Sequence, residues 1–266
     1  MVKGLYTAYT GMLNQQNRLD VLTNNLANSA TNGFKKEGAT AQSFDDMLAY
    51  KIKDTSAMGL SKRLGDVSLG VKIGECYTDY GQGSFRVTDN VYDLAIDGDG
   101  FFAISYTNKA GETSVKYTRD GAFTVNREGY LMTKDGDYVL NQAAAQAGNP
   151  GEAGYIRIDP NVELKVDENG NLYQNNALLG QVGVVDFADY NFLAKYGENL
   201  YDLVEGGQAQ ASNAQVVQGT LEMSNVNVVS EMVEMITISR AYETNQKIIQ
   251  SIDDTLEKAV NNIGKA

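Results

Sequence analysis

Two heptad repeats of apolar residues, one at each end of the chain, constrain this sequence more than any other feature. In the first repeat, every seventh residue from Leu5 is apolar, and the companion positions three residues further on are mostly apolar. The row is Leu5, Met12, Leu19 and Leu26, with companions Ala8, Gln15 and Leu22. The pattern predicts one helix over residues 4–28, about 36 Å long at a rise of 1.5 Å per residue.

The second repeat occupies the C-terminal segment and is longer. Its row is Val228, Met235, Tyr242, Ile249, Leu256 and Ile263, and its companions are Glu231, Ile238, Asn245, Ile252, Ala259 and Ala266. Neither terminal segment contains a proline, so both can be continuous helices. Periodicity alone leaves two arrangements open: the helices pair as a coiled coil, with Asn245 as a polar register mark, or each packs separately onto a central domain.

The segment between the helices has the period-two pattern and tight turns of β-structure. Short strand-like runs are separated by turn signals at Ala110-Gly111, Glu128-Gly129, Asp135-Gly136 and Asn169-Gly170. These signals predict a β-rich domain over about residues 81–219. Residues 36–80, which contain several glycines, are expected to be a connector of mixed loop and extended structure, and residues 143–154 (AAAQAGNPGEAG) a surface loop.

The charge distribution excludes two classes of partner. The formal net charge is −12, and residues 54–219 contain 23 acidic side chains against 12 basic ones. Nucleic acids and anionic membranes both require a cationic surface. The sequence therefore predicts neither nucleic acid nor membrane as a partner.

The composition also argues against most catalytic sites. The chain has no histidine and a single cysteine, Cys76, which excludes zinc sites and nucleophiles paired with histidine. Asp97, Asp99, Asp135 and Asp137 form two short acidic clusters, but their spacing does not match a calcium loop, and turn residues account for them better. We therefore expect no catalytic, metal or cofactor-binding residue, with a glycosidase-like carboxylate pair as the remaining alternative.

Neither end of the chain has the pattern of a targeting or membrane segment. Polar residues interrupt the N-terminal stretch where a secretory signal would be apolar, and no window approaches the length of a membrane span. If the protein leaves the cytoplasm, we expect it to do so without a cleaved signal.

Four asparagines lie at the end of the first predicted helix. Asn24, Asn25, Asn28 and Asn32 compete with the helix backbone for hydrogen bonds and favour termination. One asparagine would suffice to end a helix. We therefore favour the interpretation that these amides satisfy backbone groups or neighbouring chains.

The two ends together resemble the paired terminal signatures of the bacterial flagellar axial proteins of the rod and hook. The resemblance rests on LYTAYTGMLNQQNRLDVLTNNLANSATNGFKK at the N-terminal side and GTLEMSNVNVVSEMVEMITISRAYETNQKII at the C-terminal side. The middle segments LAIDGDGFFAI, YTRDGAFTVNREGYL and VGVVDFADYNFLAKYGENLY are similar to the β-domain of the distal rod subgroup and its close rod paralogue.

The resemblance implies an α+β fold in which the N- and C-terminal heptad helices pair as a coiled coil, with a central β-rich domain. Residues 1–35 and 220–266 would form the inner coiled-coil domain, 36–80 the connector, and 81–219 the outer β-rich domain. The function implied is a structural subunit that polymerises helically into the hollow flagellar rod, not an enzyme and without a small-molecule substrate. Stacking against neighbouring copies would complete the burial of the apolar rows.

The resemblance also implies partners and a location. The partners are further copies of the chain, other rod and hook proteins, the flagellar type III export apparatus and, depending on the cell envelope, bushing rings. The location is the flagellar basal body, reached by export beyond the cytoplasmic membrane without a cleaved signal.

The residues that the resemblance assigns to self-assembly lie in both terminal segments. Asn24 to Phe34 would end the inner helix, and Ser224 to Val228 would start the return helix, with Ser224 or Asn225 as its N-cap. The full set is Leu5, Met12, Leu19, Asn24, Asn25, Leu26, Asn28, Asn32, Gly33, Phe34, Ser224, Asn225, Asn227, Met235, Arg240, Tyr242, Ile249 and Leu256.

Two departures from the family pattern keep the subgroup open. The first signature reads Ser29-Ala30-Thr31 where a valine-containing form is usual, and residues 54–80 are only loosely similar to the distal-rod pattern. The alternatives are a proximal rod subunit, a hook subunit, or a soluble β-domain that binds carbohydrate or hydrolyses it. The last class predicts a monomer with a carboxylate-lined pocket.

Overall fold

A computed structural model describes residues 2–44, 47–51, 62–67, 70–148, 150–197 and 199–263. The chain divides into two compact units. The helical unit is Met1–Ala27, Lys36–Asp79 and Asn227–Ala266, and the β unit is Asn28–Lys35 and Tyr80–Val226. The fold is therefore α+β, with a helix at each end of the chain and a β-rich centre, as the sequence predicts.

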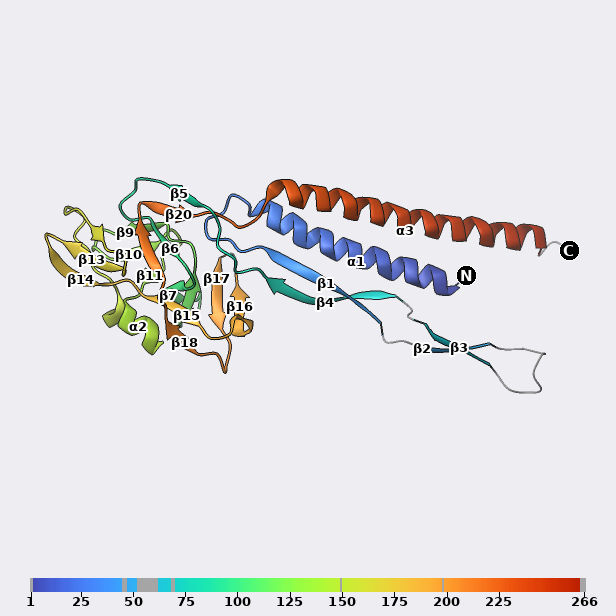
Figure 1. The fold of residues 1–266 in the computed structure, drawn as a ribbon, viewed down its shortest axis with the longest axis horizontal. Helices are drawn as coiled ribbons and strands as arrows, with labels where there is room; N and C mark the ends of the chain where they lie inside the picture. The colour runs from blue at the N-terminus through green and yellow to red at the C-terminus, as the bar shows by residue number, and fades with distance from the viewer. Residues whose placement is uncertain are drawn as a thin grey trace. The chain divides into compact units, whose positions relative to one another are not determined.

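Two long antiparallel helices form the main part of the helical unit. Helix α1 (Val2–Ala27) lies along helix α3 (Val228–Ile263), as Figure 1 shows. Gly4 of α1 lies next to the Ile252 side chain of α3, and Gly11 lies next to Asn245. These two contacts define the register of one helix along the other. Glycines at these positions let the two backbones approach closely.

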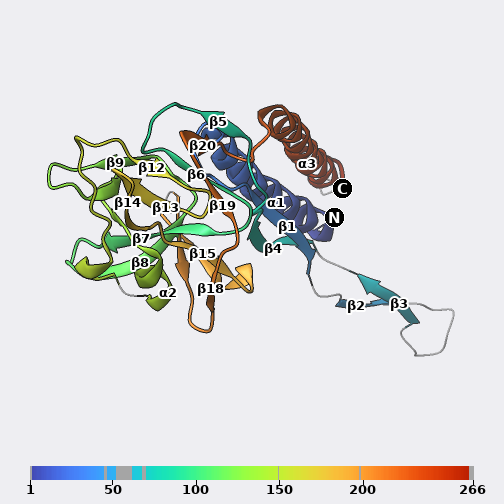
Figure 2. The ribbon, with the colours of Figure 1, turned by 60° about the vertical axis from the view of Figure 1, so that its left-hand side comes forward.

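A two-stranded ribbon covers the other side of α1. Strand β1 (Glu37–Ser43) pairs antiparallel with β4 (Val71–Thr78), and β2 (Met47–Lys51) pairs with β3 (Lys62–Val67). In Figures 1 and 2, α1 lies between α3 and the β1–β4 ribbon. The described part of the expected connector is thus mainly paired strand.

A nine-stranded sheet forms the centre of the β unit. Seven of its strands follow the order β16-β17-β8-β7-β11-β10-β9, and β15 pairs with both β7 and β18. Their bounds are β7 Phe101–Thr107, β8 Thr113–Thr118, β9 Phe123–Val125, β10 Leu131–Thr133, β11 Tyr138–Val139, β15 Val184–Phe187, β16 Leu193–Tyr196, β17 Leu200–Leu203 and β18 Ala209–Ala211.

Smaller sheets and short helices complete the β unit. The sheets are β12-β13-β14 and the pairs β19-β6 and β20-β5. The strands are β5 Phe85–Val87, β6 Leu94–Asp97, β12 Lys165–Val166, β13 Asn171–Gln174, β14 Ala177–Gln181, β19 Gln215–Gln218 and β20 Thr220–Glu222. The helices are α2 (Gln142–Ala147) and the 3₁₀ turns Glu152–Gly154 and Tyr190–Phe192.

Two hydrophobic cores lie within the β unit. The first contains Phe102, Phe123 and Leu172, and the second contains Phe101, Tyr117 and Val185. Phe101 and Phe102 are neighbours on β7 and point to opposite faces of the sheet, as the alternation of a strand requires. Strand β7 is thereby buried on both sides, which explains why LAIDGDGFFAI is nearly continuously apolar around its turn.

The four predicted turns are confirmed by the strand pairing. Gly111, Gly129, Gly136 and Gly170 each follow the residue predicted to start the turn and each have a positive φ. The turns join β7 to β8, β9 to β10, β10 to β11 and β12 to β13, and all four pairs are antiparallel. The pair β10–β11 is the shortest, with one pair of facing residues.

Two expectations about element boundaries were wrong. The segment expected to be a surface loop begins with helix α2, which Asn141 caps and whose Ala144 and Ala145 pack into the second core. Residues 220–226, expected to belong to the coiled-coil domain, lie in the β unit, because Thr220–Glu222 pair with β5. In both cases contacts distant in sequence decide the local conformation.

Candidate self-assembly surfaces

The companion heptad positions, not the rows counted from Leu5 and Val228, supply the buried apolar residues of the two terminal helices, and α1 also buries the polar residues Thr10, Asn14 and Asn25. Ala8 and Leu22 are buried on α1, and Glu231 and Ile238 on α3. Leu5, Tyr242 and Leu256 are each more than a third exposed, and Met12, Leu19, Leu26, Met235 and Ile249 are half-buried. No member of either row whose burial the structure describes is therefore fully buried within the helical unit.

Polar groups contribute to the contact between the helices. Arg18 Nη2 donates to Glu234 Oε1 at 2.8 Å, and Asn25 Nδ2 donates to Glu231 Oε2 at 3.2 Å. Together with Gly4 and Gly11, these groups replace apolar side chains along part of the helix pair. The two helices therefore combine a few buried apolar side chains with glycines and polar pairs, and other apolar side chains stay exposed.

Each helix presents an exposed apolar stripe near its own N-terminus. We call Leu5, Tyr6, Tyr9 and Leu13 the α1 stripe, and Val229, Met232, Val233 and Ile236 the α3 stripe. All eight side chains are exposed, and in each set spacings of three, four or seven residues place them on one face of the helix. Contiguous exposed apolar surface of this kind marks an interaction site.

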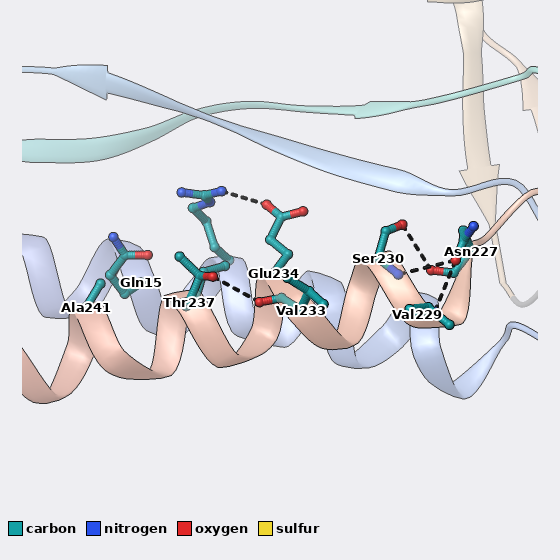
Figure 3. Close-up of a pocket in the computed structure, with 10 residues that line it drawn as sticks. Gln15, Asn227, Val229, Ser230, Val233, Glu234, Thr237 and Ala241 are labelled. Atoms are coloured by element: carbon teal, nitrogen blue, oxygen red, sulfur yellow. Dashed lines mark hydrogen bonds and ion pairs between the residues drawn. The ribbon is translucent and has the colours of Figure 1, made fainter.

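A groove of about 650 Å³ runs along the helix pair beside the α3 stripe. Gln15 and Arg18 from α1 line it, and Val229, Val233, Thr237 and Ala241 from α3 lie along it, as Figure 3 shows for the labelled residues. The carbonyl oxygen of the Gln15 side chain, Oε1, is buried and has no hydrogen-bond partner. Gln15 therefore lines the groove, but its unpaired oxygen is covered by other atoms of the chain.

Asn25 is the asparagine of the predicted cluster that is fully buried. Its Nδ2 donates to the Glu37 carbonyl at 2.8 Å, and its Oδ1 accepts from the Glu37 amide at 2.9 Å. These two bonds mimic strand pairing and attach the end of α1 to the start of β1. Asn24 is exposed on the same helix.

The residues from Asn28 to Phe34 belong to the β unit. Asn28 Oδ1 accepts from the Thr31 hydroxyl at 3.3 Å, and Asn32 Oδ1 accepts from Arg86 at 3.2 Å. Gly33 has φ +66°, and Phe34 is buried with the Lys195 ammonium 4.5 Å from its ring centroid. The amides of Asn25, Asn28 and Asn32 therefore satisfy groups of the same chain, while their use by neighbouring chains stays a prediction.

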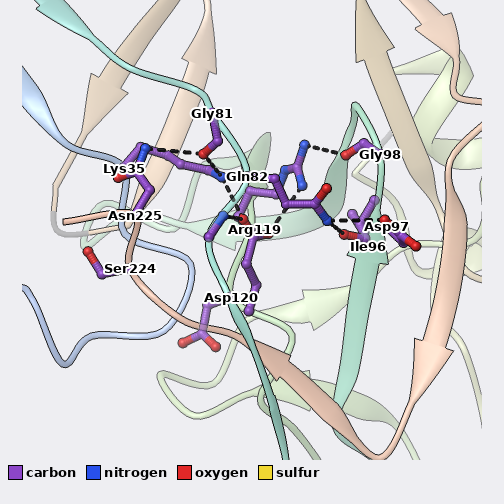
Figure 4. A network of polar contacts seen from close by, with 12 residues as sticks. Lys35, Gly81, Gln82, Ile96, Asp97, Gly98, Arg119, Asp120, Ser224 and Asn225 are labelled. Carbon is purple, nitrogen blue, oxygen red and sulfur yellow. Dashed lines mark hydrogen bonds and ion pairs between the residues drawn. The ribbon is translucent and has the colours of Figure 1, made fainter. Parts of the chain in front are cut away.

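A buried ion network holds this segment within the β unit. Glu222 Oε1 accepts from Lys35 Nζ at 2.6 Å, and Glu222 Oε2 accepts from Arg119 Nη1 at 3.1 Å. Lys35 also donates to the Gly81 carbonyl at 2.9 Å, and Arg119 to Gly98 at 2.8 Å, as Figure 4 shows. All three ionic side chains are at most 2% exposed. Such a network is costly to disrupt because it leaves a buried charge unpaired.

The start of α3 differs from the expected cap. Asn227 Oδ1 accepts from the amides of Val229 and Ser230 at 3.1 and 3.2 Å, so Asn227 is the N-cap. Ser224 instead accepts from the Val226 amide, and Asn225 donates to the Gly81 carbonyl. The assignment of the cap to Ser224 or Asn225 was therefore wrong.

Family models of flagellar proteins match three parts of the chain. The model described as "Flagella basal body rod protein" matches residues 5–35, the flagellar hook protein FlgE/F/G D1 domain matches 95–178, and the flagellar basal body rod FlgEFG protein C-terminal region matches 217–263. The flagellar basal-body rod protein FlgG of Bacillus subtilis is 36% identical over 98% of this chain and 99% of its own length. The chain belongs to the flagellar basal-body rod protein family.

Other rod-family relatives also match end to end. The flagellar hook-basal body complex protein FlhO of Bacillus subtilis is 33% identical over the whole of both chains. The rod protein FlgF of Caulobacter vibrioides is 33% identical over 100% of this chain and 99% of its own. The chain is thus a structural subunit of the flagellar rod, located in the basal body and assembling with other rod and hook proteins.

The terminal segments of the rod protein contain one further assigned residue, Arg240, which is exposed on α3.

The sequence alone did not assign a role to Lys35, Arg119 or Glu222. The sequence contained one signal for this network, a glutamate inside the otherwise neutral segment GTLEMSN. A carboxylate in a buried strand requires a buried partner.

The acidic clusters of the rod protein lie in the β unit, where Asp97 ends strand β6 and Asp99 and Asp135 lie in bends or turns. Asp120, Asp135 and Asp137 line a cavity of about 490 Å³, and burial raises the pKa of Asp120 and of Asp137. Among the described residues, no group of three or more acidic, cysteine or histidine side chains could hold a metal ion. No described helix is both long and apolar enough to span a membrane. The family is a structural one, so we do not assign chemistry to this cavity.

Proposed function

We propose that this rod subunit polymerises helically through its terminal helices into a hollow drive shaft, and that it belongs to the distal rod. In this proposal α1 and α3 pair as a coiled coil that forms the inner layer, and the β unit lies outside. The assignment to the distal rod is supported by the middle segments quoted above, which are similar to the β-domain of the distal rod subgroup and its close rod paralogue; a proximal rod subunit is the alternative.

The exposure of the two apolar stripes carries the proposal. Tyr9 is 53% and Val233 is 60% exposed, although each lies on a helix that already has a packing partner. Burying such surface is favourable by about 25 cal/mol per Å² of apolar area. An interface between different faces of identical subunits generates an open helical polymer when the rotation relating them does not close.

The proposal includes the route and the contacts of the subunit in the cell. The subunit is exported by the flagellar type III apparatus without a cleaved signal peptide, and it contacts bushing rings where the cell envelope provides them. The self-assembly residues of the two terminal segments, from Leu5 to Phe34 and from Ser224 to Leu256, would lie at or beside contacts between subunits.

Removal of the terminal helices tests the proposal. A chain of residues 28–226 retains both hydrophobic cores and the Glu222 network, and near-ultraviolet circular dichroism checks that its tyrosines remain packed. We expect the full chain to sediment as polymers at rising concentration and the shortened chain to remain monomeric. Equal polymerisation of the two chains would contradict a mechanism based on the terminal helices.

A further inference from the structure

Carboxylates from three segments of the β unit gather at one cavity. Asp120 follows β8, and Asp135 and Asp137 lie between β10 and β11. All three line the cavity of about 490 Å³, which we call the Asp120 cavity. Asp93, directly before β6, is 7% exposed and acts electrostatically on the Asp120 carboxylate. The four carboxylates therefore belong to one electrostatic cluster.

The basic side chains near this cluster are mostly bound elsewhere. Lys116 pairs with Asp202 at 2.6 Å, and Arg119 belongs to the buried ion network, from which the Asp120 side chain points away in Figure 4. Lys134 is the one basic residue in the described lining of the cavity, and it is exposed. The other titratable residues of the lining are Tyr106 and Tyr196. Phenol groups are uncharged below about pH 8.

Burial penalises the ionised form of the cluster. Burial raises the pKa of Asp120, although the Ala122 amide, which donates to Asp120 Oδ1 at 3.0 Å, and the charge of Lys134 act in the opposite direction. Burial, and then the charge of Asp135, raise the pKa of Asp137. A carboxylate whose pKa is raised in the folded state destabilises that state when it is ionised. The penalty is present at neutral pH and disappears as the pH falls through the folded-state pKa toward the ordinary value of 3.8.

The turn that carries Asp135 and Asp137 belongs to a short hairpin. Strands β10 and β11 share one pair of facing residues. Within the turn, the Thr133 amide donates to the Asp137 carbonyl at 2.8 Å, and the Gly136 amide donates to the Thr133 carbonyl at 3.2 Å. Repulsion from Asp120 therefore acts on a part of the sheet that its own strand pairing holds weakly.

We propose that the Asp120 cavity is an acid-responsive brace: when its carboxylates take up protons, the β10–β11 turn packs more tightly and the β unit becomes more stable. A protonated carboxyl group donates a hydrogen bond that a neighbouring carboxylate oxygen can accept, so attraction replaces repulsion. The protons come from the solvent. The inference concerns the folded β unit of a single chain and does not depend on the proposed polymerisation.

Two matched aspartate variants test the brace. Asp120→Asn removes the charge and keeps an oxygen that can accept from the Ala122 amide. Asp159→Asn is the control, because Asp159 Oδ1 also accepts from the amide two residues further on, that of Asn161, at 3.0 Å. Asp159 is exposed and is not among the described residues that line the cavity. Urea unfolding of the full chain as a dilute monomer is followed by near-ultraviolet circular dichroism at pH 7.5 and pH 5.5.

The two variants should respond differently to pH. We expect Asp120→Asn to lower the unfolding equilibrium constant at least about threefold at pH 7.5, and this gain to shrink at pH 5.5. Asp159→Asn should stay within about twofold of the unsubstituted chain at both pH values. A pH-independent effect of Asp120→Asn, or the same pH dependence in both variants, would overturn the inference.

Hydrogen exchange locates the effect within the β unit. Protection factors of the Thr133 and Gly136 amides are compared with that of the Val182 amide, which donates to the Gly170 carbonyl at 2.9 Å away from the cavity. Between pH 7.5 and pH 5.5 we expect the first two to rise at least about threefold more than the third in the unsubstituted chain. An equal rise at all three amides would contradict a local brace.

A second variant keeps the test decisive if Asp120→Asn does not fold. Asp137→Asn removes a charge of the same cluster and leaves Asp120 in place. It should also stabilise the β unit at pH 7.5 and lose part of that gain at pH 5.5, and the absence of both effects would overturn the inference.

Discussion

At the scale of single residues, the adjacent lysines Lys35 and Lys36 have separate partners in the two units. Lys35 bonds the buried Glu222 within the β unit, and Lys36 pairs with the buried Glu231 within the helical unit. Each glutamate lies close in sequence to the point where α3 begins. The sequence Gly-Phe-Lys-Lys therefore encodes one ionic anchor for each unit.

The Glu222 network predicts unequal effects of removing its members. Glu222→Gln leaves Lys35 and Arg119 buried without an anion, and we expect it to lower the free energy of unfolding of the β unit by about 3–5 kcal/mol. Lys35→Met leaves Glu222 paired with Arg119, so its expected cost is about 1–3 kcal/mol. Urea unfolding followed by near-ultraviolet circular dichroism measures both, and a larger cost for Lys35→Met would contradict this account.

Gly33 gives a second prediction at this scale. It has φ +66°, and a Cβ atom there would lie 2.5 Å from the backbone of Arg119. We expect Gly33→Ala to destabilise the β unit by about 2 kcal/mol more than the control Gly111→Ala. An alanine at either position is strained by about 1 kcal/mol or more because the backbone is left-handed. Gly111, however, has open space where the Cβ atom would lie. Equal urea midpoints for the two variants would show that the close approach is relieved without cost.

Lys36 predicts a dependence of stability on high pH. Its hydrogen bond with Glu231 raises the pKa of the Lys36 ammonium above its ordinary value of 10.5. A raised pKa in the folded state contributes stability below pH 10.5, and this contribution disappears as the pH rises through the folded-state pKa. We expect the difference in unfolding free energy between the unsubstituted chain and Lys36→Met to be constant from pH 8 to 10 and to shrink above that range. A pH-independent difference would exclude the ionic contribution.

At the scale of elements, the start of α3 is set by a side chain outside the heptad pattern. Asn227 caps the helix, and the preceding β20 is held by its pairing with β5. The heptad row begins at Val228, one residue after the cap, so the pattern identifies the first helical residue. It does not show that Asn227 caps the helix or that a strand precedes it.

We expect Asn227→Ala to reduce helix stability by about 1 kcal/mol, because two amides of the first turn lose their acceptor. Asn227→Asp is the matched control, since a carboxylate accepts the same bonds and favours the positive end of the helix dipole. The far-ultraviolet signal at 222 nm during thermal unfolding measures both. A loss of the same size in Asn227→Asp would mean that the amide acts through another contact.

At the scale of the whole molecule, the two units bury apolar surface to different extents. Both large hydrophobic cores identified among the described residues lie in the β unit, where Tyr80, Phe101 and Tyr201 contact one another. The helical unit leaves both apolar stripes exposed. Its stability as a monomer should therefore be the lower of the two.

This difference predicts two transitions when the monomer unfolds in urea. The helical signal at 222 nm should fall at a lower urea concentration than the near-ultraviolet tyrosine signal, which reports mainly the β unit. Polymerisation should bring the two transitions closer, because docking buries the stripes in the assembled state. Coincident transitions in dilute monomer would contradict independent stability of the units.

Local sequence patterns determined the terminal helices, the four glycine turns and the class of fold. Heptad spacing from Leu5 and Val228 follows from helix geometry, and a glycine such as Gly129 is required wherever a tight turn needs a positive φ. The helices and the turns both depend on residues a few positions apart, so the sequence predicts them without knowledge of contacts between distant segments.

Only the tertiary structure decided which positions are buried and which polar groups meet. Glu222 and Arg119 are 103 positions apart, and Asn25 and Glu231 are 206 apart. No local pattern records such pairs, because chain topology brings them together. The same applies to the heptad rows: periodicity places apolar residues on one side of a helix, but packing against β1, β4 and the other helix selects which of them remain exposed.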